Sequence, residues 1–383
     1  MDFESLFDIP IDNLHTPCYL TDARLLQKNT ALLKQIQQRT GCKILLAQKA
    51  FSMYSVYPIM REYLAGSTAS GLYEARLGHE HFGGETHVFS PAYREEEFEQ
   101  ILQFADHLVF NSPAQLRRYA LRAKAAGKSV GLRINPEHST QEGHAIYDPC
   151  APGSRLGTTL SNFDESLLPL LDGLHFHTLC EQNSDDLEAT AKAFEERFGK
   201  YLHQLHWLNF GGGHHITRPD YDIPRLISVI EHFRDRYDVQ IYLEPGEATV
   251  YHAGFLVSSV LETMHNGMEI AILDTSAACH MPDVLEMPYR PPLLNSGEAG
   301  EKPYTYRLGG PTCLAGDIIG DYSFDHEIQI GDKLYFEDMA IYSMVKNNTF
   351  NGMCLPSIAR MDENGECSVV KTFGYEEFVR RLG

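Results

Sequence analysis

The feature that most constrains this chain is an alternation of short apolar segments with helical stretches, which runs from residue 43 to residue 248. Eight segments are predicted as strands: 43–50, 66–70, 85–91, 107–112, 129–136, 173–179, 206–213 and 239–248. Amphipathic helices are expected in the gaps, most clearly over 184–200 behind a cap at Asn183. Eight β/α units in about 200 residues is the number that closes a (β/α)8 barrel. A doubly wound open sheet is the alternative, although no GxGxxG motif follows the first strand.

The pattern changes after residue 250. The following segments are short, β-rich and separated by Gly, Pro, Asn and Asp, at 255–260, 269–273, 304–308 and 333–336. This spacing predicts an antiparallel β domain. The segment 16–20 is also strand-like, but it precedes a helix expected over 22–39 rather than a barrel strand. We therefore assign it to the C-terminal β domain.

Composition narrows the class of protein. The 383 residues exceed one ordinary domain, and no apolar run is long enough to cross a bilayer. The first residues lack the basic region of a signal peptide, and eight cysteines without a CxxC pair argue against a zinc site or a disulfide framework. The scattered cysteines indicate a reducing cytoplasm. The net charge of −20 argues against nucleic acid and is compatible with cationic small molecules.

Lys49 is the most informative single residue. It lies at the end of the apolar run 44–51, which is predicted as the first barrel strand. Lysine is almost never fully buried unless it is paired, so an inward-pointing lysine needs a chemical reason. One such reason is a Schiff base with an aldehyde, which removes the ammonium. The alternative is that the strand ends one residue earlier and Lys49 lies in solvent.

Polar residues also mark other strand ends, which is where barrel enzymes place their chemistry. The fifth strand carries Arg133, and the sixth ends at His175 and His177, which project from the same side. Gly211–Gly213 follow the seventh strand, and three glycines allow backbone N–H groups to approach an anion. Taken alone, the glycines indicate a turn and His177 a structural histidine.

Together with Glu244 at the end of the eighth strand, these residues fit a phosphorylated aldehyde cofactor, pyridoxal 5′-phosphate (PLP). Lys49 would hold the aldehyde, and His177 would stack on the ring. A buried Glu244 would keep the ring nitrogen protonated, which makes the ring a stronger electron sink. Gly211–Gly213 would bind the phosphate, because the loops after strands seven and eight are the usual phosphate site of a barrel.

At this point the chain resembles a known family, the fold-type III PLP-dependent decarboxylases, which include ornithine, arginine and diaminopimelate decarboxylases. The resemblance covers nearly the whole chain, with shared elements at 111–112, 154–157, 310–313, Tyr342 and 350–352. Within the group the chain is most similar to carboxynorspermidine decarboxylases, through 47–50, 177–181, 244–248, 280–290 and 310–317. The last two segments are long and specific.

The resemblance implies an alanine-racemase-like architecture, with a PLP-binding barrel over 22–250 and a β domain built from 1–21 and 251–383. It implies a head-to-tail homodimer with shared active sites, in which 310–317 reaches the partner's barrel. The reaction would release CO₂ from carboxynorspermidine and carboxyspermidine, giving norspermidine and spermidine.

The resemblance also completes the expected site. Catalysis falls to Lys49, Glu244, His177 and Cys313, which would protonate the substrate after CO₂ leaves. The cofactor would be held by Lys49, Arg133, His177, Gly211, Gly212, Gly213, Glu244, Gly246 and Tyr342. The substrate would be held by His280, Asp283, Glu286, Arg290 and Asp317, with Arg290 equally compatible with a structural ion pair. No metal is expected.

The chain departs from the wider group at three positions. Glu247 stands where relatives carry a phosphate-binding Arg, and its negative charge would repel phosphate. Cys180 replaces a phosphate-binding Ser and is a poorer donor. Glu286 stands near the position of the Arg with which diaminopimelate decarboxylases bind a distal carboxylate, and the reversed charge favours a substrate that ends in an amine.

Other functions remain as alternatives. A diaminopimelate or ornithine/arginine-type decarboxylase would share the fold. A racemase would set an Arg against the ring nitrogen, which Glu244 disfavours. A non-catalytic PLP-binding homologue should have lost Lys49 or Cys313, and a PLP-homeostasis protein would lack the β domain.

Overall fold

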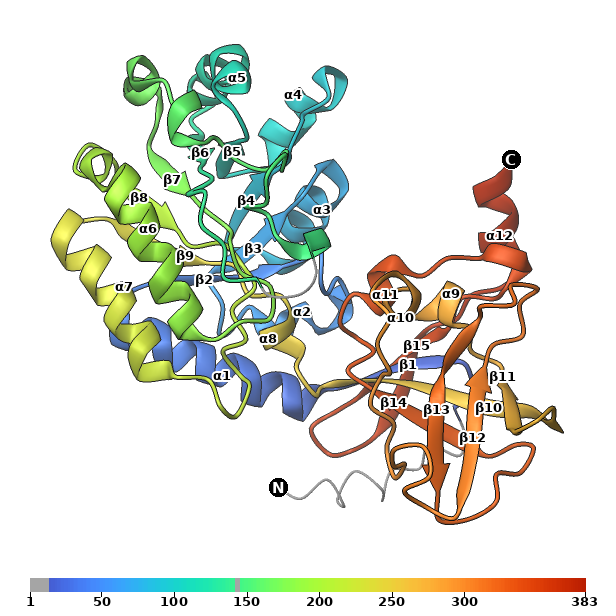
Figure 1. Cartoon of the computed structure of the whole chain (residues 1–383). Coiled ribbons are helices and arrows are strands. Elements are labelled where there is room, and N and C mark those ends of the chain that lie inside the picture. Colours follow the sequence, from blue (N-terminus) through green and yellow to red (C-terminus); the bar gives the residue numbers. More distant parts are fainter. Residues whose placement is uncertain (1–13, 142–144) are drawn as a thin grey trace. The chain divides into compact units, whose positions relative to one another are not determined.

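The computed structural model describes residues 14–141 and 145–383 (Figure 1). The predicted start of the β domain at 1–13 lies outside the described residues. Contacts divide the chain into two compact units. One unit is Gln27–Thr249, and the other combines the residues up to Leu26 with Val250–Gly383.

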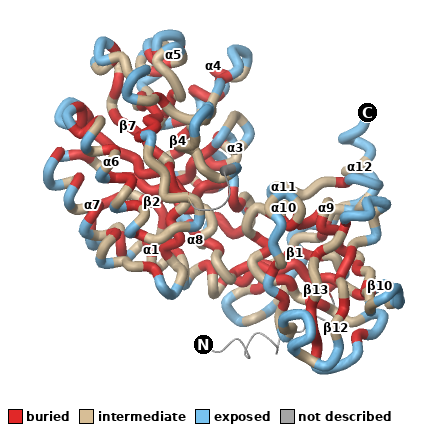
Figure 2. The backbone as a smooth tube through the Cα atoms, viewed as in Figure 1, coloured by how far each residue is buried: buried red, intermediate tan, exposed pale blue. Residues whose placement is uncertain are grey.

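The first unit is a closed barrel of eight parallel strands, which confirms the predicted fold (Figure 1). The strands are β2 (Lys43–Ala47), β3 (Gly66–Ala69), β4 (Glu85–Phe89), β5 (His107–Phe110), β6 (Ser129–Arg133), β7 (Gly173–His175), β8 (Trp207–Asn209) and β9 (Gln240–Leu243). Each pairs with the next, and β9 closes the barrel on β2 through Lys43 and Tyr242. Buried residues are concentrated along these strands (Figure 2).

Helices surround the barrel: α1 (Ala23–Thr40), α2 (Tyr57–Met60), α3 (Leu72–Leu77), α4 (Glu95–Phe104), α5 (Pro113–Ala125), α6 (Ser184–Leu202), α7 (Ile223–Tyr237) and α8 (Glu247–Val250). The predicted cap of α6 is present, because Asn183 Oδ1 accepts the Ser184 N–H at 2.7 Å. The expected helix between β6 and β7 is wrong for the described residues, which form only short 3-10 turns there. Pro149, Pro152 and Pro169 account for this, since proline removes a helical donor.

The amino-terminal end of the barrel is closed by a packed network. The Trp207 indole lies against Gly131 and Gly173, where an added Cβ would come within 2.3 and 2.0 Å of the ring. Glu85 contacts Lys43, and its other oxygen is 3.1 Å from His87 Nε2.

The His87 and His107 rings stack with centroids 3.9 Å apart and planes 10° from parallel. Glu85, His87 and His107 offer ligand atoms within 4.8 Å of one another. Parallel rings direct their nitrogens side by side rather than toward one ion, so these groups act as a polar part of the core.

The second unit is a mainly antiparallel β sheet, as predicted. Its strands are β1 (Cys18–Asp22), β10 (Gly254–His265), β11 (Glu269–Leu273), β12 (Tyr304–Gly309), β13 (Ile318–Phe324), β14 (Lys333–Glu337), β15 (Ser357–Met361) and β16 (Cys367–Lys371). Strand β1 pairs antiparallel with β10, which confirms its assignment to this sheet. Two pairs, β1–β15 and β11–β12, are parallel.

Among the described residues, four helices accompany this sheet: α9 (Ala277–His280), α10 (Asp283–Glu286), α11 (Ser343–Lys346) and α12 (Tyr375–Leu382). The core packs Tyr19 and Leu256 against Tyr322 and Phe336. Within the described ranges, no helix combines the length and apolarity that a membrane span requires.

Candidate active site

Lys49 lies in the turn that follows β2. The strand ends at Ala47, so the prediction that it continues through Lys49 is wrong; Ala50 N–H donates to Ala47 O at 3.1 Å and closes the turn. Lys49 is exposed, as the alternative interpretation of the sequence expected, although the surrounding protein partly desolvates its amine. This desolvation lowers the pKa of Lys49, and Arg133 lowers it further, while Glu244 opposes the shift. More of the amine is therefore neutral, which is its nucleophilic form.

Glu244 follows β9 directly and is only 7 % exposed. Asn209 Nδ2 donates to its Oε1 at 2.7 Å, and His175 Nε2 is 3.5 Å from its Oε2. Burial alone would raise the pKa of Glu244, but His175 and Asn209 favour the charged form and bring the pKa to about 2. The site thus holds a carboxylate that stays ionised across the physiological range.

His175, the last residue of β7, is buried beside this carboxylate. Within the described part of the chain, its Nδ1 has no hydrogen-bond partner, while its Nε2 faces Glu244 Oε2 at 3.5 Å. Desolvation lowers the pKa of His175, while Glu244 opposes it. Buried polar atoms without partners are rare, so they indicate a place for a further polar group. Sequence reasoning assigned no role to His175 or Asn209, although both end barrel strands.

His177 lies two residues beyond β7. Gly212 N–H donates to its Nδ1 at 3.1 Å, so the ring proton is on Nε2. Desolvation lowers the pKa of His177 well below its ordinary value, and the charges of Lys49 and Arg133 add to this effect. The structure therefore presents His177 as a neutral ring, which suits stacking.

Arg133 ends β6 and supports this arrangement. Its Nη2 donates to His177 O at 3.2 Å, and its guanidinium lies 4.6 Å from the centre of the Phe89 ring. Burial lowers the pKa of Arg133 to about 10, so it remains cationic at neutral pH. The strand ends thus bring together Lys49, Arg133, His177 and Glu244, as the sequence predicted.

The glycine loop after β8 has a conformation that requires glycine. Gly211 and Gly213 have φ of 69° and 82°, and an added Cβ would lie 2.5 Å from Phe176 O and 2.0 Å from Leu179 O. Among the described residues, the Gly213 N–H has no acceptor. At Gly246 an added Cβ would be 2.5 Å from the Ala50 Cβ. The loop after β9 therefore packs closely against the turn that carries Lys49.

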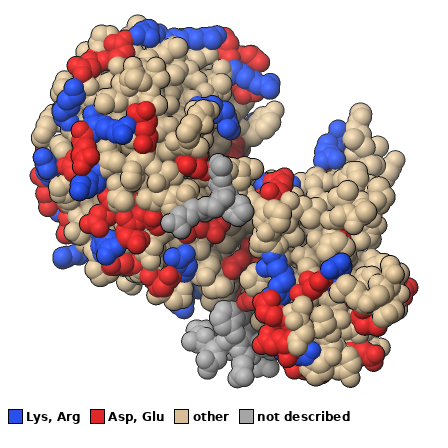
Figure 3. Space-filling view, in the orientation of Figure 1, with Lys and Arg blue, Asp and Glu red and all other residues tan. Residues whose placement is uncertain are grey.

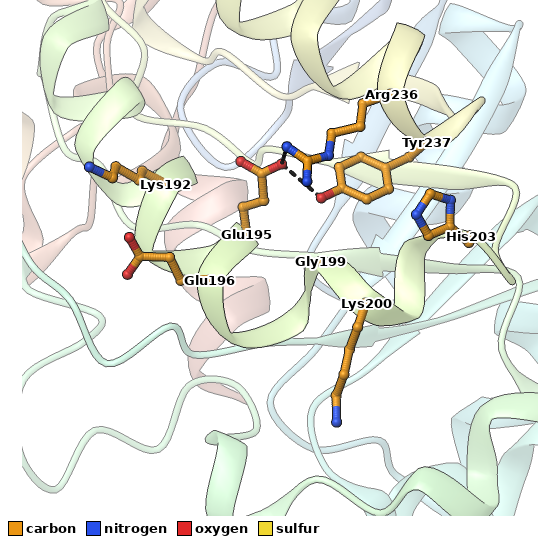
Figure 4. A pocket seen from close by; sticks show the side chains of 8 residues that line it. All are labelled: Lys192, Glu195, Glu196, Gly199, Lys200, His203, Arg236 and Tyr237. Atoms are coloured by element: carbon orange, nitrogen blue, oxygen red, sulfur yellow. Dashed lines mark hydrogen bonds and ion pairs between the residues drawn. The ribbon is translucent and has the colours of Figure 1, made fainter.

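Another hollow on the barrel unit lies away from these residues (Figure 4). It is a groove of about 460 Å³ between α6 and α7 on the outside of the barrel. Tyr237 OH donates to Glu195 Oε1 at 2.7 Å, and Arg236 Nη1 lies 3.3 Å from the same oxygen. These groups satisfy one another, so the groove is a polar seam between helices rather than a reactive site.

The remaining predicted residues lie on the β unit. Cys313 is exposed on the loop after β12, and its N–H donates to Asn351 Oδ1 at 2.9 Å. Asp317 is only 3 % exposed. Its Oδ1 accepts from Ser276 Oγ at 3.0 Å, and its Oδ2 accepts from Thr312 Oγ1 at 2.6 Å. Asp317 thereby fastens the base of the loop that presents Cys313.

The acidic residues after α9 have a partner that sequence reasoning missed. Asp283 and Glu286 both form ion pairs with the Lys346 ammonium. One cation between two carboxylates leaves a net negative charge at this place. Lys346 belongs to no motif in the sequence. Its role as the partner of these carboxylates is visible only in the structure, where α11 packs beside α9.

His280 and Arg290 are engaged within the β unit. His280 is fully buried, with Nδ1 accepting from Ser276 N–H at 3.2 Å and Nε2 3.0 Å from Cys354 O. Arg290 pairs with Glu298 and lies 4.6 Å above the Tyr322 ring. For Arg290 this is the structural ion pair that the sequence left open. Tyr342 precedes α11 with φ of 55°.

Comparisons with known proteins agree with this geometry. The family model described as "Pyridoxal-dependent decarboxylase, C-terminal sheet domain" matches residues 18–340. The chain therefore belongs to the pyridoxal-dependent decarboxylase family, as its motifs predicted.

Individual relatives show which decarboxylases within the family the chain is similar to. The chain is 42 % identical to the carboxynorspermidine/carboxyspermidine decarboxylase of Campylobacter jejuni, over 97 % of this chain and 99 % of that protein. It is also 42 % identical to the carboxyaminopropylagmatine decarboxylase of Synechocystis sp., over 97 % of each. A crystal structure of carboxynorspermidine decarboxylase complexed with norspermidine from Campylobacter jejuni matches with a TM-score of 0.90 and 41 % identity, covering 96 % of this chain and all of that one.

Proposed function

We propose that this chain is a PLP-dependent carboxy-lyase that converts carboxynorspermidine to norspermidine and carboxyspermidine to spermidine. The observation that carries the proposal is that the strand ends of one barrel bring together Lys49, whose pKa is lowered, and Glu244, which stays ionised. Full-length similarity to decarboxylases of these substrates supports it.

The residues present fit the cofactor. Bound PLP would accept the electron pair of the bond between Cα and the departing carboxylate. Lys49 would hold the aldehyde carbon, and Glu244 would keep a proton on the ring nitrogen. The neutral ring of His177 would lie against the cofactor ring, held in orientation by Gly212 and Arg133.

The phosphate would be bound by the loops after β8 and β9. Among the described residues Gly213 N–H has no backbone acceptor, and Gly211, Gly212 and Gly246 allow close approach of the backbone. We include Tyr342 in this set, contributed by the β unit. Of the proposed substrate-binding residues, Asp283 and Glu286 would meet the substrate amines, Asp317 would act chiefly by positioning the Cys313 loop, and His280 and Arg290 would act through the β unit that engages them.

We also propose that two copies of the chain form a homodimer with shared sites. Residues 313–316 are exposed, and the loop is held rigid at its base by Asp317. A rigid, exposed loop that carries a thiol is suited to enter a partner's barrel, where Cys313 would deliver a proton to Cα after CO₂ leaves. The eight cysteines, which form no disulfide, fit a cytoplasmic enzyme.

Charge supports a polyamine-like substrate. The chain has 52 acidic and 32 basic residues, and on the face shown in Figure 3 the basic side chains are dispersed among acidic ones. A net negative protein attracts cations. Desolvating two cationic amines is costly unless carboxylates meet them, and Asp283 and Glu286 retain one negative charge beyond the charge that Lys346 neutralises.

Carboxyaminopropylagmatine is a second candidate substrate, because a relative that acts on it is equally similar to this chain. It would present a guanidinium where carboxynorspermidine ends in a primary amine. A bidentate carboxylate can bind either group, so the measurement must include both.

A substrate panel tests the proposal. Purified protein with PLP is expected to release CO₂ from carboxynorspermidine and carboxyspermidine with kcat/KM roughly 10–100-fold above that for ornithine or lysine, because the shorter substrates leave a charged hydrogen bond unmade. CO₂ and amine product are measured together, with diaminopimelate and carboxyaminopropylagmatine in the same panel. Efficient turnover of ornithine or diaminopimelate would contradict the proposal and identify the chain as one of the alternative decarboxylases. Preferred turnover of carboxyaminopropylagmatine would select the second candidate.

Subunit mixing tests the shared site. Lys49→Ala and Cys313→Ala proteins should each be nearly inactive, and random exchange should restore about a quarter of wild-type activity, because half the dimers then hold one intact site. Cys354→Ala, at another exposed cysteine, is the matched control and should retain activity alone. Absence of recovery after exchange is verified by mass spectrometry would place Lys49 and Cys313 in the site of one subunit.

A further inference from the structure

Two carboxyl groups meet beside the glycine loop, and the proposed chemistry gives neither a role. Glu181 lies in the loop after β7 with φ of 53°, and Glu247 is the first residue of α8, after β9. Their carboxyl groups lie close enough to interact with each other. His215, from the loop after β8, places Nε2 3.4 Å from Glu247 Oε2. Three consecutive βα loops therefore converge on this carboxyl pair.

Backbone hydrogen bonds fix the loops around the pair. Gln182 N–H donates to Gly213 O at 3.0 Å, and His215 N–H donates to Gln182 O at 3.2 Å. The segment that carries Glu181 is thus fastened to the glycine loop itself. The pair borders the loops after β8 and β9, which are the seventh and eighth barrel strands, and these loops are where barrels bind phosphate.

Two neighbouring carboxylates that repel each other cannot both ionise without a large penalty. Repulsion from Glu247 and burial raise the pKa of Glu181 to about 7, although His215 and Arg218 oppose the shift. The other ionisable groups nearby are Lys49, which interacts with Glu247 and Cys180, and Asp220, which interacts with His215. Arg218 is not aimed at the carboxyl groups, because its Nε donates to Asp220 at 2.5 Å and its Nη1 donates to Glu181 O at 3.4 Å.

We propose that the Glu181–Glu247 pair retains one proton and donates it in a hydrogen bond to the phosphate group of the bound cofactor, so that cofactor affinity falls as pH rises. The inference rests on the proposed function. It also removes the conflict between the charge of Glu247 and the cofactor phosphate. A protonated carboxyl pair can donate a hydrogen bond to phosphate at the position where relatives carry a cationic arginine. A retained proton makes phosphate binding reversible with pH, which a permanent guanidinium would not.

The test uses apo-protein and pyridoxine 5′-phosphate, whose alcohol cannot react with Lys49. Calorimetric titrations from about pH 7 to about pH 9 keep the phosphate doubly ionised, since its second pKa is near 6. Wild-type affinity should fall about tenfold per pH unit in this range, and binding near pH 8 should take up about one proton from the buffer. Glu181→Gln provides a donor that cannot ionise, and Glu247→Arg provides a permanent cation. Both should bind with affinity that changes less than about twofold and without proton uptake.

Glu62→Gln, at an exposed glutamate on the barrel, is the matched control and should keep the wild-type pH dependence. A flat wild-type profile, a wild-type slope in Glu181→Gln, or no binding at any pH would overturn the inference. A flat profile in a protein that still becomes yellow with PLP and is fixed to it by borohydride would overturn this inference alone. Failure of that covalent attachment would instead overturn the proposed function.

Discussion

Replacing Lys49 with alanine is expected to abolish covalent attachment of PLP and to reduce turnover by more than about 10³-fold, as removal of a covalent-catalysis nucleophile does. The structure gives the reason. Desolvation and Arg133 lower the pKa of Lys49, so its amine is primed for an aldehyde, and Lys49 interacts electrostatically with both Glu244 and His177. The wild-type protein should be yellow, and borohydride should fix the cofactor to the peptide that contains Lys49.

Lys28→Ala is the matched control, because Lys28 is exposed on α1. It should retain colour, covalent attachment and activity. A Lys49→Ala protein that still carries borohydride-fixed cofactor would assign the attachment to another amine. A wild-type protein that stays colourless with added PLP would refute the proposed function itself.

The barrel could be predicted from sequence because its strands are buried on both faces and form apolar runs. The boundaries could not, since a run of apolar residues does not stop where the strand stops. Ala50 and Phe51 are buried beyond β2, so the apolar run continued past Ala47 and carried the predicted strand through Lys49. Between β6 and β7, regular βα alternation outweighed the prolines that exclude a helix.

The site residues were found by one rule, that polar groups at barrel strand ends need a reason. This rule identified Lys49, Arg133, His177 and Glu244, which the structure brings together. It overlooked the partners that set their charge states. Asn209 and His175 hold Glu244 ionised, and Lys346 neutralises part of the Asp283–Glu286 charge, yet none of these contacts has a fixed spacing in the sequence.

Asp317 shows a different limit. Its place in a distinctive motif suggested contact with a substrate amine, but both of its oxygens accept hydrogen bonds from its own unit. A motif identifies a residue that matters without saying whether it touches the ligand or holds a loop. The satisfied carboxylate indicates a positioning role, through which Asp317 would act on Cys313.

Glu244→Gln should lower kcat by roughly 10²–10³-fold, the range for loss of one preorganised charge at a reacting centre. Glutamine preserves the shape and the acceptor for Asn209, but it removes the negative charge that would keep a proton on the cofactor ring. PLP should still bind, because Lys49 and the glycine loops are unchanged. Stopped-flow absorbance measures binding, and CO₂ release measures turnover.

The lowered pKa of Glu244 also predicts how stability and reaction rate depend on pH. Burial would raise its pKa, but His175 and Asn209 hold the pKa at about 2, below its ordinary value of 4.5. A carboxyl of lowered pKa stabilises the fold above the ordinary value and loses this contribution as pH falls toward 2. The fall of the wild-type rate at acid pH should therefore not arise from protonation of Glu244. Glu244→Gln should leave the midpoint pH of that fall unchanged while lowering the maximal kcat. Glu62→Gln should change neither, whereas undiminished kcat in Glu244→Gln would show that a proton on the ring nitrogen does not limit the reaction.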